Sequence, residues 1–488
     1  MMRVLEGLKP EKVFYYFEEI CKIPHGSGNI WQISDYLTNF AKARELEYYQ
    51  DKIGNVIIIK EASKGYENSA PVMIQGHMDM VAVKKPDCNI DMEKEGLRLC
   101  ISGDKIYAQG TSLGGDDGIA VAYGLALLDD DSYKHPRLEL VITVDEEVGM
   151  DGAREIDLSC CKSTTMINVD SEEEGIFLAG CAGGARVNHL LDYQETQKQG
   201  ICFRIQVTGL VGGHSGVEIH KERGNANCLL GRVLYRLYEK MPFVLVSLEG
   251  GLADNAIPRE AYAEILFTNV DNARECEEQL QAVINNMNCD LQTELSQKDK
   301  DVCVSVDCCD TMQRTAANEQ TTQKILAYLI ALPNGVQAMS GAMEGLVETS
   351  LNLGILVCRD GKLHTGISVR SSYESAKWAL IDRLKALGTL VGAETEITGD
   401  YPGWAFSIHS PLRDKMVKLY REMYGIEPEI QAIHAGLECG LFAGKIQGLD
   451  CVSMGPDMKN IHTTEEELSI ASTKRVWEFL TRLLEEMK

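Results

Sequence analysis

The sequence lacks the two features that would direct a chain into or across a membrane. Residues 1–12 contain no apolar core of signal-peptide length. No stretch along the 488 residues reaches the roughly 18 consecutive apolar residues of a membrane-spanning helix. We therefore expect a cytoplasmic protein with no membrane partner.

Cysteine motifs are also missing, although the chain has 16 cysteines. There is no C-x-x-C, and the closest spacings are the adjacent pairs Cys160-Cys161 and Cys308-Cys309. Neither a zinc ribbon nor a thioredoxin-like redox motif is therefore supported. Most cysteines are expected to be reduced, small core residues.

Basic residues are scarce relative to acidic ones. The chain has 48 Lys and Arg against 73 Asp and Glu, which gives a formal net charge of −25. Because a phosphate backbone attracts clustered basic side chains, this balance argues against nucleic acid or an anionic membrane as a partner. Most of these carboxylates are interpreted as solvated surface groups.

The length predicts either two domains or one domain with a large insertion. In residues 1–185, segments with helical spacing, such as 11–21 and 119–128, alternate with short β-rich runs such as 55–60 and 138–144. Residues 399–488 return to this alternation. Both parts together predict an α/β catalytic domain with a mixed sheet covered by helices.

The pattern of predicted strands and helices changes in residues 186–398. Strand-like runs there alternate with long helical segments, such as 226–240 and 373–387, in a pattern that repeats once. We expect an inserted α+β domain made of two successive units.

Residues that can bind metal ions or move protons follow several of the predicted strands, where open α/β sheets place their ligand sites. His77 and Asp79 follow one β-rich run, and Asp116 stands directly before an apolar helix. Each has an ordinary alternative: an H-x-D tripeptide suits a surface loop, and acidic residues before a helix cap it.

Three further segments complete this set. Asp145, Glu146 and Glu147 close an apolar strand, Asp170 closes another, and His462 precedes the last helix. Buried like charges repel one another unless a cation neutralises them, so three carboxylates at a buried strand end favour a metal site over a solvated loop.

Taken together, five segments offer imidazole or carboxylate ligands and no thiolate. This donor set suits Zn²⁺, or alternatively Mn²⁺ or Co²⁺. The surplus of carboxylates indicates two metal ions that share a bridging ligand, with one carboxylate left free as a base.

At this level of detail the sequence resembles the two-zinc metallopeptidases that include the bacterial Xaa-His (aminoacyl-histidine) dipeptidases. The resemblance runs from end to end. It is carried by eight segments in the same order: GHMDMV, SLGGDDGIA, VDEEVGMDGA, NVDSEEEG, GLVGGHSGVEIH, GNAN, HAGLECG and IHT.

The resemblance implies a role for each metal-site residue. His77 and Asp170 would hold one zinc ion, Glu147 and His462 the other, and Asp116 would bridge the two. Asp79 would orient His77, and Glu146 would be the general base. The peptide bond between Asp116 and Asp117 is expected to be cis.

The inserted domain would be the lid of that family, built from two ferredoxin-like units. His214 would reach the scissile carbonyl, and Asn255 and Arg370 would bind the carbonyl or C-terminal carboxylate of the substrate. Gly436 and Glu438 would belong to a substrate-contacting loop, whereas His434 is expected to be structural. A glycine turn around His214 and an exposed strand at Arg370 are the alternatives.

The expected activity is therefore the hydrolysis of dipeptides, of Xaa-His type and including β-alanyl-histidine, by a water that two zinc ions activate. Lid closure would limit substrate length. The alternatives are a deacylase or tripeptidase on the same scaffold, or a non-catalytic metal-binding protein. A homodimer through the lid is a further expectation from the resemblance.

Overall fold

The computed structural model describes residues 3–268, 270 and 272–488. By internal contacts the chain divides into two compact units. The first unit comprises Met1–Gly180, Phe406–Ala432 and Leu437–Lys488, and the second comprises Cys181–Ala405 and Ile433–Gly436. The contacts therefore change after Gly180 and Ala405, whereas the sequence pattern favoured boundaries after residues 185 and 398.

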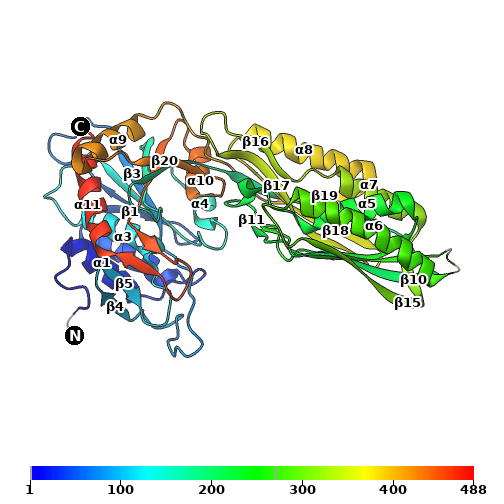
Figure 1. The fold of residues 1–488 in the computed structure, drawn as a ribbon. Coiled ribbons are helices and arrows are strands. Elements are labelled where there is room, and N and C mark those ends of the chain that lie inside the picture. Colours follow the sequence, from blue (N-terminus) through cyan, green and yellow to red (C-terminus); the bar gives the residue numbers. More distant parts are fainter. Residues whose placement is uncertain (1–2, 269, 271) are drawn as a thin grey trace. The chain divides into compact units, whose positions relative to one another are not determined.

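An eight-stranded sheet forms the centre of the first unit, in the order β1-β2-β6-β3-β7-β21-β8-β20 (Figure 1). Strands β6, β3, β7 and β21 are parallel neighbours, whereas β1 and β2 are antiparallel. The mixed sheet expected from the sequence is thus confirmed. The strands are β1 (Glu47–Gln50), β2 (Val56–Lys60), β3 (Val72–His77), β6 (Leu138–Thr143), β7 (Thr165–Asn168), β8 (Ile176–Cys181), β20 (Glu429–Ile433) and β21 (Asp450–Ser453).

Helices pack against this sheet. Helix α2 contacts β2, α3 contacts β3, and α9 and α10 contact β21. All 14 residues of α3 are buried, which explains why its sequence is apolar on every face. The helices are α1 (Glu11–Cys21), α2 (Trp31–Ala43), α3 (Gly115–Leu128), α4 (Asp151–Glu155), α9 (Pro411–Tyr424), α10 (Glu438–Lys445) and α11 (Ile470–Glu485).

A smaller sheet of the first unit orders the segment that contains His462. Its strands lie in the order β22-β23-β5-β4. The bounds are β4 (Leu99–Ser102), β5 (Lys105–Ala108), β22 (Met458–Lys459) and β23 (Glu467–Ser469). Because β22 and β23 are antiparallel, residues 460–466 form the loop between them.

The second unit is built on a nine-stranded sheet whose main path is β15-β10-β14-β12-β17-β18-β9-β19. One half follows the order β10, α5, β12, β14, α6, β15 along the chain and the order β15-β10-β14-β12 in space. This is the ferredoxin-like arrangement. Its elements are β10 (Glu195–Thr208), α5 (Ala226–Lys240), β12 (Val244–Gly250), β14 (Ala261–Phe267), α6 (Ala273–Glu294) and β15 (Cys303–Ala317).

The other half has the same arrangement, in the spatial order β17-β18-β9-β19. Its elements are β9 (Gly183–Asp192), α7 (Glu319–Ala331), β17 (Val347–Arg359), β18 (Lys362–Ser371), α8 (Glu374–Val391) and β19 (Glu394–Tyr401). Since β9 precedes the whole first half, the two ferredoxin-like units are nested rather than successive. A local alternation of helix and strand cannot reveal this, because the pairing of β9 with β18 joins distant residues.

Three short strands complete the second unit. Strand β16 (Gly335–Met339) pairs with β17, and β11 (Gly213–His214) pairs with β13 (Ala256–Ile257). Figure 1 shows helices α5 to α8 along one face of the long sheet. Among the described helices of the whole chain, none has the length and apolarity needed to cross a membrane.

Candidate metal centre

Three of the expected metal ligands meet at one edge of the large sheet. His77 ends β3, Glu147 lies in the loop after β6, and Asp170 lies two residues beyond β7. These strands are parallel neighbours in register, with His77 opposite Thr143 and Gln75 opposite Asn168. Their carboxyl ends therefore deliver the three side chains to the same place.

Two other segments complete the set. Asp116 lies at the start of α3, and His462 lies in the loop between β22 and β23. The two oxygens of Asp116 face different histidines: Oδ1 is 3.1 Å from Nε2 of His77, and Oδ2 is 3.2 Å from Nε2 of His462. A carboxylate oriented in this way can bridge two cations.

Two of the groups of potential ligand atoms share Asp116. His77, Asp116 and Asp170 make one group, and Asp116, Glu147 and His462 make the other, with the atoms of each group within 4.8 Å of one another. Nε2 of His462 is 2.8 Å from Oε1 of Glu147, and Nε2 of His77 is 3.7 Å from Oδ1 of Asp170. Imidazole and carboxylate ligands at this spacing fit two divalent metal ions such as zinc.

The electrostatics of the cluster favour positive charge. Burial disfavours a charged His77, but its hydrogen bonds to Asp116, Asp170 and Asp79 outweigh burial and raise its pKa well above the usual value. Hydrogen bonds to Asp116 and Glu147 raise the pKa of His462 to about 10. Burial raises the pKa of Asp170 to about 6, although the neighbouring His77 opposes this shift. Three carboxylates at one buried point thus attract cations strongly.

Asp79 holds both His77 and the loop after β6. The Nδ1–H of His77 donates to the backbone carbonyl of Asp79 at 2.9 Å, which leaves Nε2 to face the cluster. The carboxylate of Asp79 accepts the backbone N–H of Glu146 at 3.1 Å and of Glu147 at 3.4 Å, and the hydroxyl of Ser27 at 2.8 Å. The main-chain carbonyl of Asp79 therefore contacts His77 closely, and its carboxylate, with Oδ1 3.5 Å from Nδ1 of His77, accepts the backbone of the loop.

Glu146 belongs to neither of the two groups centred on Asp116. It lies instead in a third group, with His77 and Glu147. Burial raises its pKa well above the usual value; His77 opposes this shift, whereas Asp170 and Glu438 add to it. A carboxyl group with a raised pKa beside a cluster of ligands has the properties of a general base.

Glu438, which the resemblance assigns to a substrate-contacting loop, is held at the ends of β3 and β6. Its side chain is completely buried, and Oε2 accepts hydrogen bonds from Nε2 of Gln75 at 2.5 Å and from Oγ1 of Thr143 at 2.7 Å. Burial raises its pKa to about 7. Oε2 of Glu438 thus ties α10 to the ends of β3 and β6, whereas Oε1 is buried and has no hydrogen-bond partner among the described residues.

The second unit contains the remaining expected site residues. His214 on β11 pairs with Ala256 on β13, next to Asn255, whose side chain is exposed. The backbone N–H groups of Gly216 and Val217 donate to Nδ1 of His214 at 3.1 and 3.3 Å. Nδ1 is therefore the acceptor, and the proton of the neutral ring is on Nε2. Burial and the charge of Arg370 lower the pKa of His214.

Arg370 on β18 is largely buried. Its Nη1 donates to the hydroxyl of Tyr401 at 3.1 Å, and its Nε has no hydrogen-bond partner among the described residues. His434 is hydrogen-bonded through Nε2 to the hydroxyl of Ser350 at 2.7 Å, and burial with the charge of Arg370 lowers its pKa to about 3. Gly436 belongs to this unit too, and a Cβ there would lie 2.8 Å from the ring of Tyr401.

Sequence patterns also missed a supporting residue of the metal cluster. Glu466 is buried and accepts hydrogen bonds from the backbone just before Asp116. In the sequence it belongs to a run of acidic residues that looks like a solvated surface segment, so only its burial distinguishes it. The expected cis bond between Asp116 and Asp117 is confirmed.

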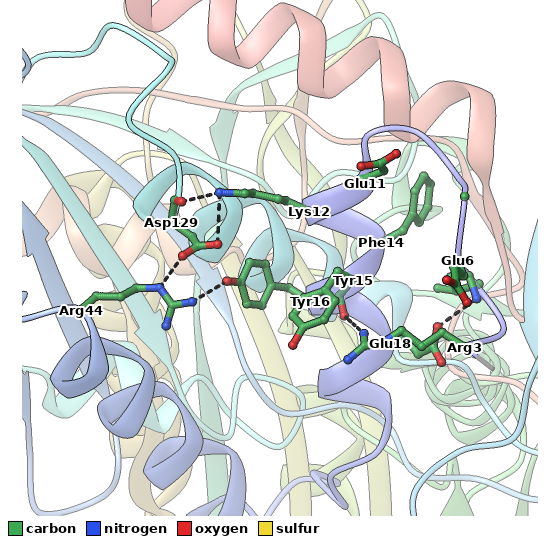
Figure 2. A pocket seen from close by; sticks show the side chains of 12 residues that line it. Arg3, Glu6, Glu11, Lys12, Phe14, Tyr15, Tyr16, Glu18, Arg44 and Asp129 are labelled. Carbon is green, nitrogen blue, oxygen red and sulfur yellow. Dashed lines mark hydrogen bonds and ion pairs between the residues drawn. The ribbon is translucent and has the colours of Figure 1, made fainter. Parts of the chain in front are cut away.

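A large open pocket lies elsewhere, beside α1 (Figure 2), with a volume of about 700 Å³. Three of its charged side chains pair with one another or with a tyrosine. Arg44 binds Asp129 through Nε at 2.6 Å and the hydroxyl of Tyr16 through Nη2 at 2.8 Å, and Nζ of Lys12 lies 3.2 Å from Asp129. Because these groups neutralise each other within the chain, the metal cluster is the better candidate site.

Comparison with known proteins places the chain among metal-dependent peptidases, in agreement with the geometry of the cluster. Residues 73–486 match the model of the peptidase family M20/M25/M40. The chain is 38% identical over 488 residues to the cytosol non-specific dipeptidase of Escherichia coli (strain K12), covering all of this chain and 99% of that protein.

Solved structures agree with this match. The aminoacylhistidine dipeptidase of Vibrio alginolyticus superposes with a TM-score of 0.92 at 35% identity, covering 99% of this chain and 98% of that one. The aminopeptidase PepT of Bacillus cereus shares the fold. Its TM-score is 0.57 at 16% identity, covering 98% of this chain and 99% of that one.

The bridging position of Asp116 leads to a prediction about metal content. Asp116→Asn should lower the number of bound metal ions from two per chain towards none, because Asp116 belongs to both groups of ligands. Asp170→Asn or Glu147→Gln should lower this number towards one, because each of these residues belongs to only one of the two groups that share Asp116. Atomic emission after dialysis against limiting Zn²⁺ measures this content. Glu155→Gln, at an exposed glutamate of α4, is the matched control. Two tightly bound ions in Asp116→Asn would contradict the bridging role.

Proposed function

The chain is a member of the peptidase family M20/M25/M40, and from this membership we propose that it hydrolyses dipeptides with two bound metal ions. The observation that carries the proposal is Asp116, which turns one oxygen to His77 and the other to His462. We propose Xaa-His dipeptides, including β-alanyl-histidine, as substrates. Similarity to an aminoacylhistidine dipeptidase and to a non-specific dipeptidase over nearly the whole chain supports this substrate class.

In the proposed site, His77 and Asp170 would hold one metal ion, Glu147 and His462 would hold the other, and Asp116 would contribute to both. The donor chemistry supports zinc, with Co²⁺ or Mn²⁺ as alternatives. When bound, two such cations supply Lewis-acid chemistry: they polarise a peptide carbonyl and acidify water.

Glu146 is the proposed general base. It takes the proton of the attacking water and passes it to the nitrogen of the leaving amine. Asp79 contributes indirectly, because its carboxylate holds the backbone N–H of Glu146 and its carbonyl holds His77. The neighbours Glu146 and Glu147 thus have separate roles, proton transfer and metal binding.

Substrate recognition is proposed for residues of the second unit. His214 carries its proton on Nε2, so a neutral ring can donate a hydrogen bond to the oxyanion that forms on the scissile carbonyl. Arg370, whose Nε is free of hydrogen bonds among the described residues, is proposed to bind the C-terminal carboxylate. The exposed Asn255 and the backbone at Gly436 are proposed as further substrate contacts. Glu438, whose Oε1 has no hydrogen-bond partner among the described residues, is proposed as another.

We also propose a cytoplasmic location, which the name of the Escherichia coli relative supports, and a homodimer formed through the second unit. The family resemblance is the basis of the dimer, and sedimentation analysis tests it.

A substrate panel tests the proposed activity. Xaa-His dipeptides should be hydrolysed with a kcat/KM at least tenfold above that for the matching tripeptides and N-acetyl amino acids, because the second unit is expected to limit substrate length and the similar proteins are dipeptidases. Tenfold corresponds to about 1.4 kcal/mol. Chelation of the metal should abolish hydrolysis. Faster cleavage of acetylated amino acids would identify a deacylase, faster cleavage of tripeptides a tripeptidase, and metal binding without any hydrolysis a binding protein.

Removing the general base should lower the rate without removing the metal. Glu146→Gln should decrease kcat by about 10²- to 10⁴-fold, since proton transfer by a positioned side chain contributes about this much. Steady-state kinetics with β-alanyl-histidine, together with metal analysis, make the measurement. Glu155→Gln serves as the matched control, and unchanged hydrolysis by a metal-loaded Glu146→Gln would refute the assignment.

His214 should act as a neutral hydrogen-bond donor at neutral and alkaline pH. Its pKa is lowered below the usual 6.5 of histidine, so the ring is neutral from that pH upwards and its titration should not shape the pH profile there. His214→Ala should lower kcat by about 10²- to 10³-fold, as for loss of one oxyanion donor. His214→Gln, which keeps an N–H donor, should lose less. Equal kcat values for His214→Ala and the parent would rule out the role.

A further inference from the structure

Glu466 lies in the loop between β22 and β23 of the first unit, and its carboxylate is surrounded by backbone donors. Oε2 accepts the N–H of Leu113 at 2.7 Å and of Gly114 at 3.1 Å. Oε1 accepts the N–H of Gly115 at 2.8 Å and of Asp116 at 3.4 Å. Only 3% of the Glu466 residue is exposed.

These contacts occupy both oxygens of Glu466, so the side chain is not a free metal ligand. They also satisfy the backbone N–H groups at the start of α3, which have no partner within the helix. A buried carboxylate is well suited to this position, because hydrogen bonds to a charged acceptor are strong and the helix N-terminus attracts negative charge.

The approach of Glu466 to the backbone is close. A Cβ on Gly115 would lie 3.3 Å from Oε1 of Glu466 and 3.2 Å from the sulfur of Met458. Gly114 has a left-handed backbone, with φ of 68° and ψ of 33°, which directs successive N–H groups towards the carboxylate. The two glycines before Asp116 thus allow one side chain to hold four consecutive amides.

The same loop contacts Asp116 a second time. His462, four residues before Glu466, places Nε2 at 3.2 Å from Oδ2 of Asp116. One loop therefore holds the main chain of Asp116 through Glu466 and meets its side chain through His462.

We propose that Glu466 is a positioning residue that fixes Asp116 relative to His462, so that the bridging carboxylate and the last ligand reach the metal cluster as one unit. This inference rests on the proposed two-metal function.

The neighbouring Glu465 provides a matched control. Its side chain is 67% exposed, and it forms a surface ion pair with Nζ of Lys85 at 2.6 Å. Exposed ion pairs of this kind contribute little to stability. Glu465 and Glu466 thus allow the same substitution at adjacent positions, one on the surface and one against the backbone of Asp116.

The test compares Glu466→Gln with Glu465→Gln. The amide nitrogen of glutamine cannot accept a hydrogen bond. In Glu466→Gln, the two backbone N–H groups that one carboxylate oxygen accepted would therefore face the NH₂ group of the glutamine side chain and lose their acceptor. We expect Zn²⁺ affinity, measured by chelator competition, to fall by about 10- to 100-fold, as is typical when a group that orients a metal ligand is lost. The absorption spectrum with Co²⁺ should change as well, and Glu465→Gln should match the parent in both measurements.

The outcomes separate this inference from the function on which it rests. Parent-like Zn²⁺ affinity and Co²⁺ spectrum in Glu466→Gln, with two metals bound, would overturn the positioning role and leave the proposed function intact. A parent chain that binds no metal would instead overturn the proposed function. A merely structural role would lower the unfolding temperature of metal-free Glu466→Gln without changing metal affinity, and that result also counts against the proposal.

Should Glu466→Gln not fold, hydrogen exchange in the parent chain tests the same contacts. In metal-free protein we expect the amides of Leu113 and Gly115 to exchange slowly, because Glu466 binds them independently of metal. Exchange as fast as in an unprotected loop would overturn the proposal.

Discussion

The repulsion between buried carboxylates at the carboxyl edge of β6, β3 and β7 is the constraint on which the rest of the first unit depends. Asp116, Glu147 and Asp170 all lie within reach of His77 or His462. Burial alone would drive such groups to take up protons, so the arrangement is stable only where positive charge balances it. The parallel strands β6, β3 and β7, in fixed register, bring His77, Glu147 and Asp170 to the same edge of the sheet.

Carboxylates of a different kind keep the ligands in place. Asp79 and Glu466 accept backbone N–H groups, and Glu438 accepts side-chain N–H and O–H groups from the ends of β3 and β6. All three are buried, and each contacts a segment that carries an expected metal ligand. Because the ligands lie on strand ends and loops, such supports determine how accurately the ligand atoms are placed. Besides its solvated surface carboxylates, this strongly acidic chain thus has two kinds of buried carboxylate: potential metal ligands, and acceptors of hydrogen bonds from the segments that carry those ligands.

The second unit follows a different electrostatic principle. Burial and the charge of Arg370 lower the pKa of His214 and of His434, so a fixed cation here lies near imidazoles that favour the neutral form. A buried chain of contacts supports Arg370: Nζ of Lys377 donates to the carbonyl of Tyr401 at 2.7 Å, and the hydroxyl of Tyr401 accepts from Arg370. In the proposed function, the negative charge that attracts metal ions belongs to the first unit, and the positive charge of Arg370 that attracts a substrate carboxylate belongs to the second.

The sequence by itself predicted the mixed α/β sheet, the inserted α+β domain and, through the resemblance, the family and the residues proposed as ligands. Local periodicity and ordered motifs encode these features because each depends on neighbouring residues. Only the tertiary structure decided the nested order of the ferredoxin-like halves and the buried contacts of Glu438 and Glu466, which depend on residues far away in the sequence. Glu465 and Glu466 are the same residue in the same acidic run, and burial against distant backbone amides alone gives them different roles.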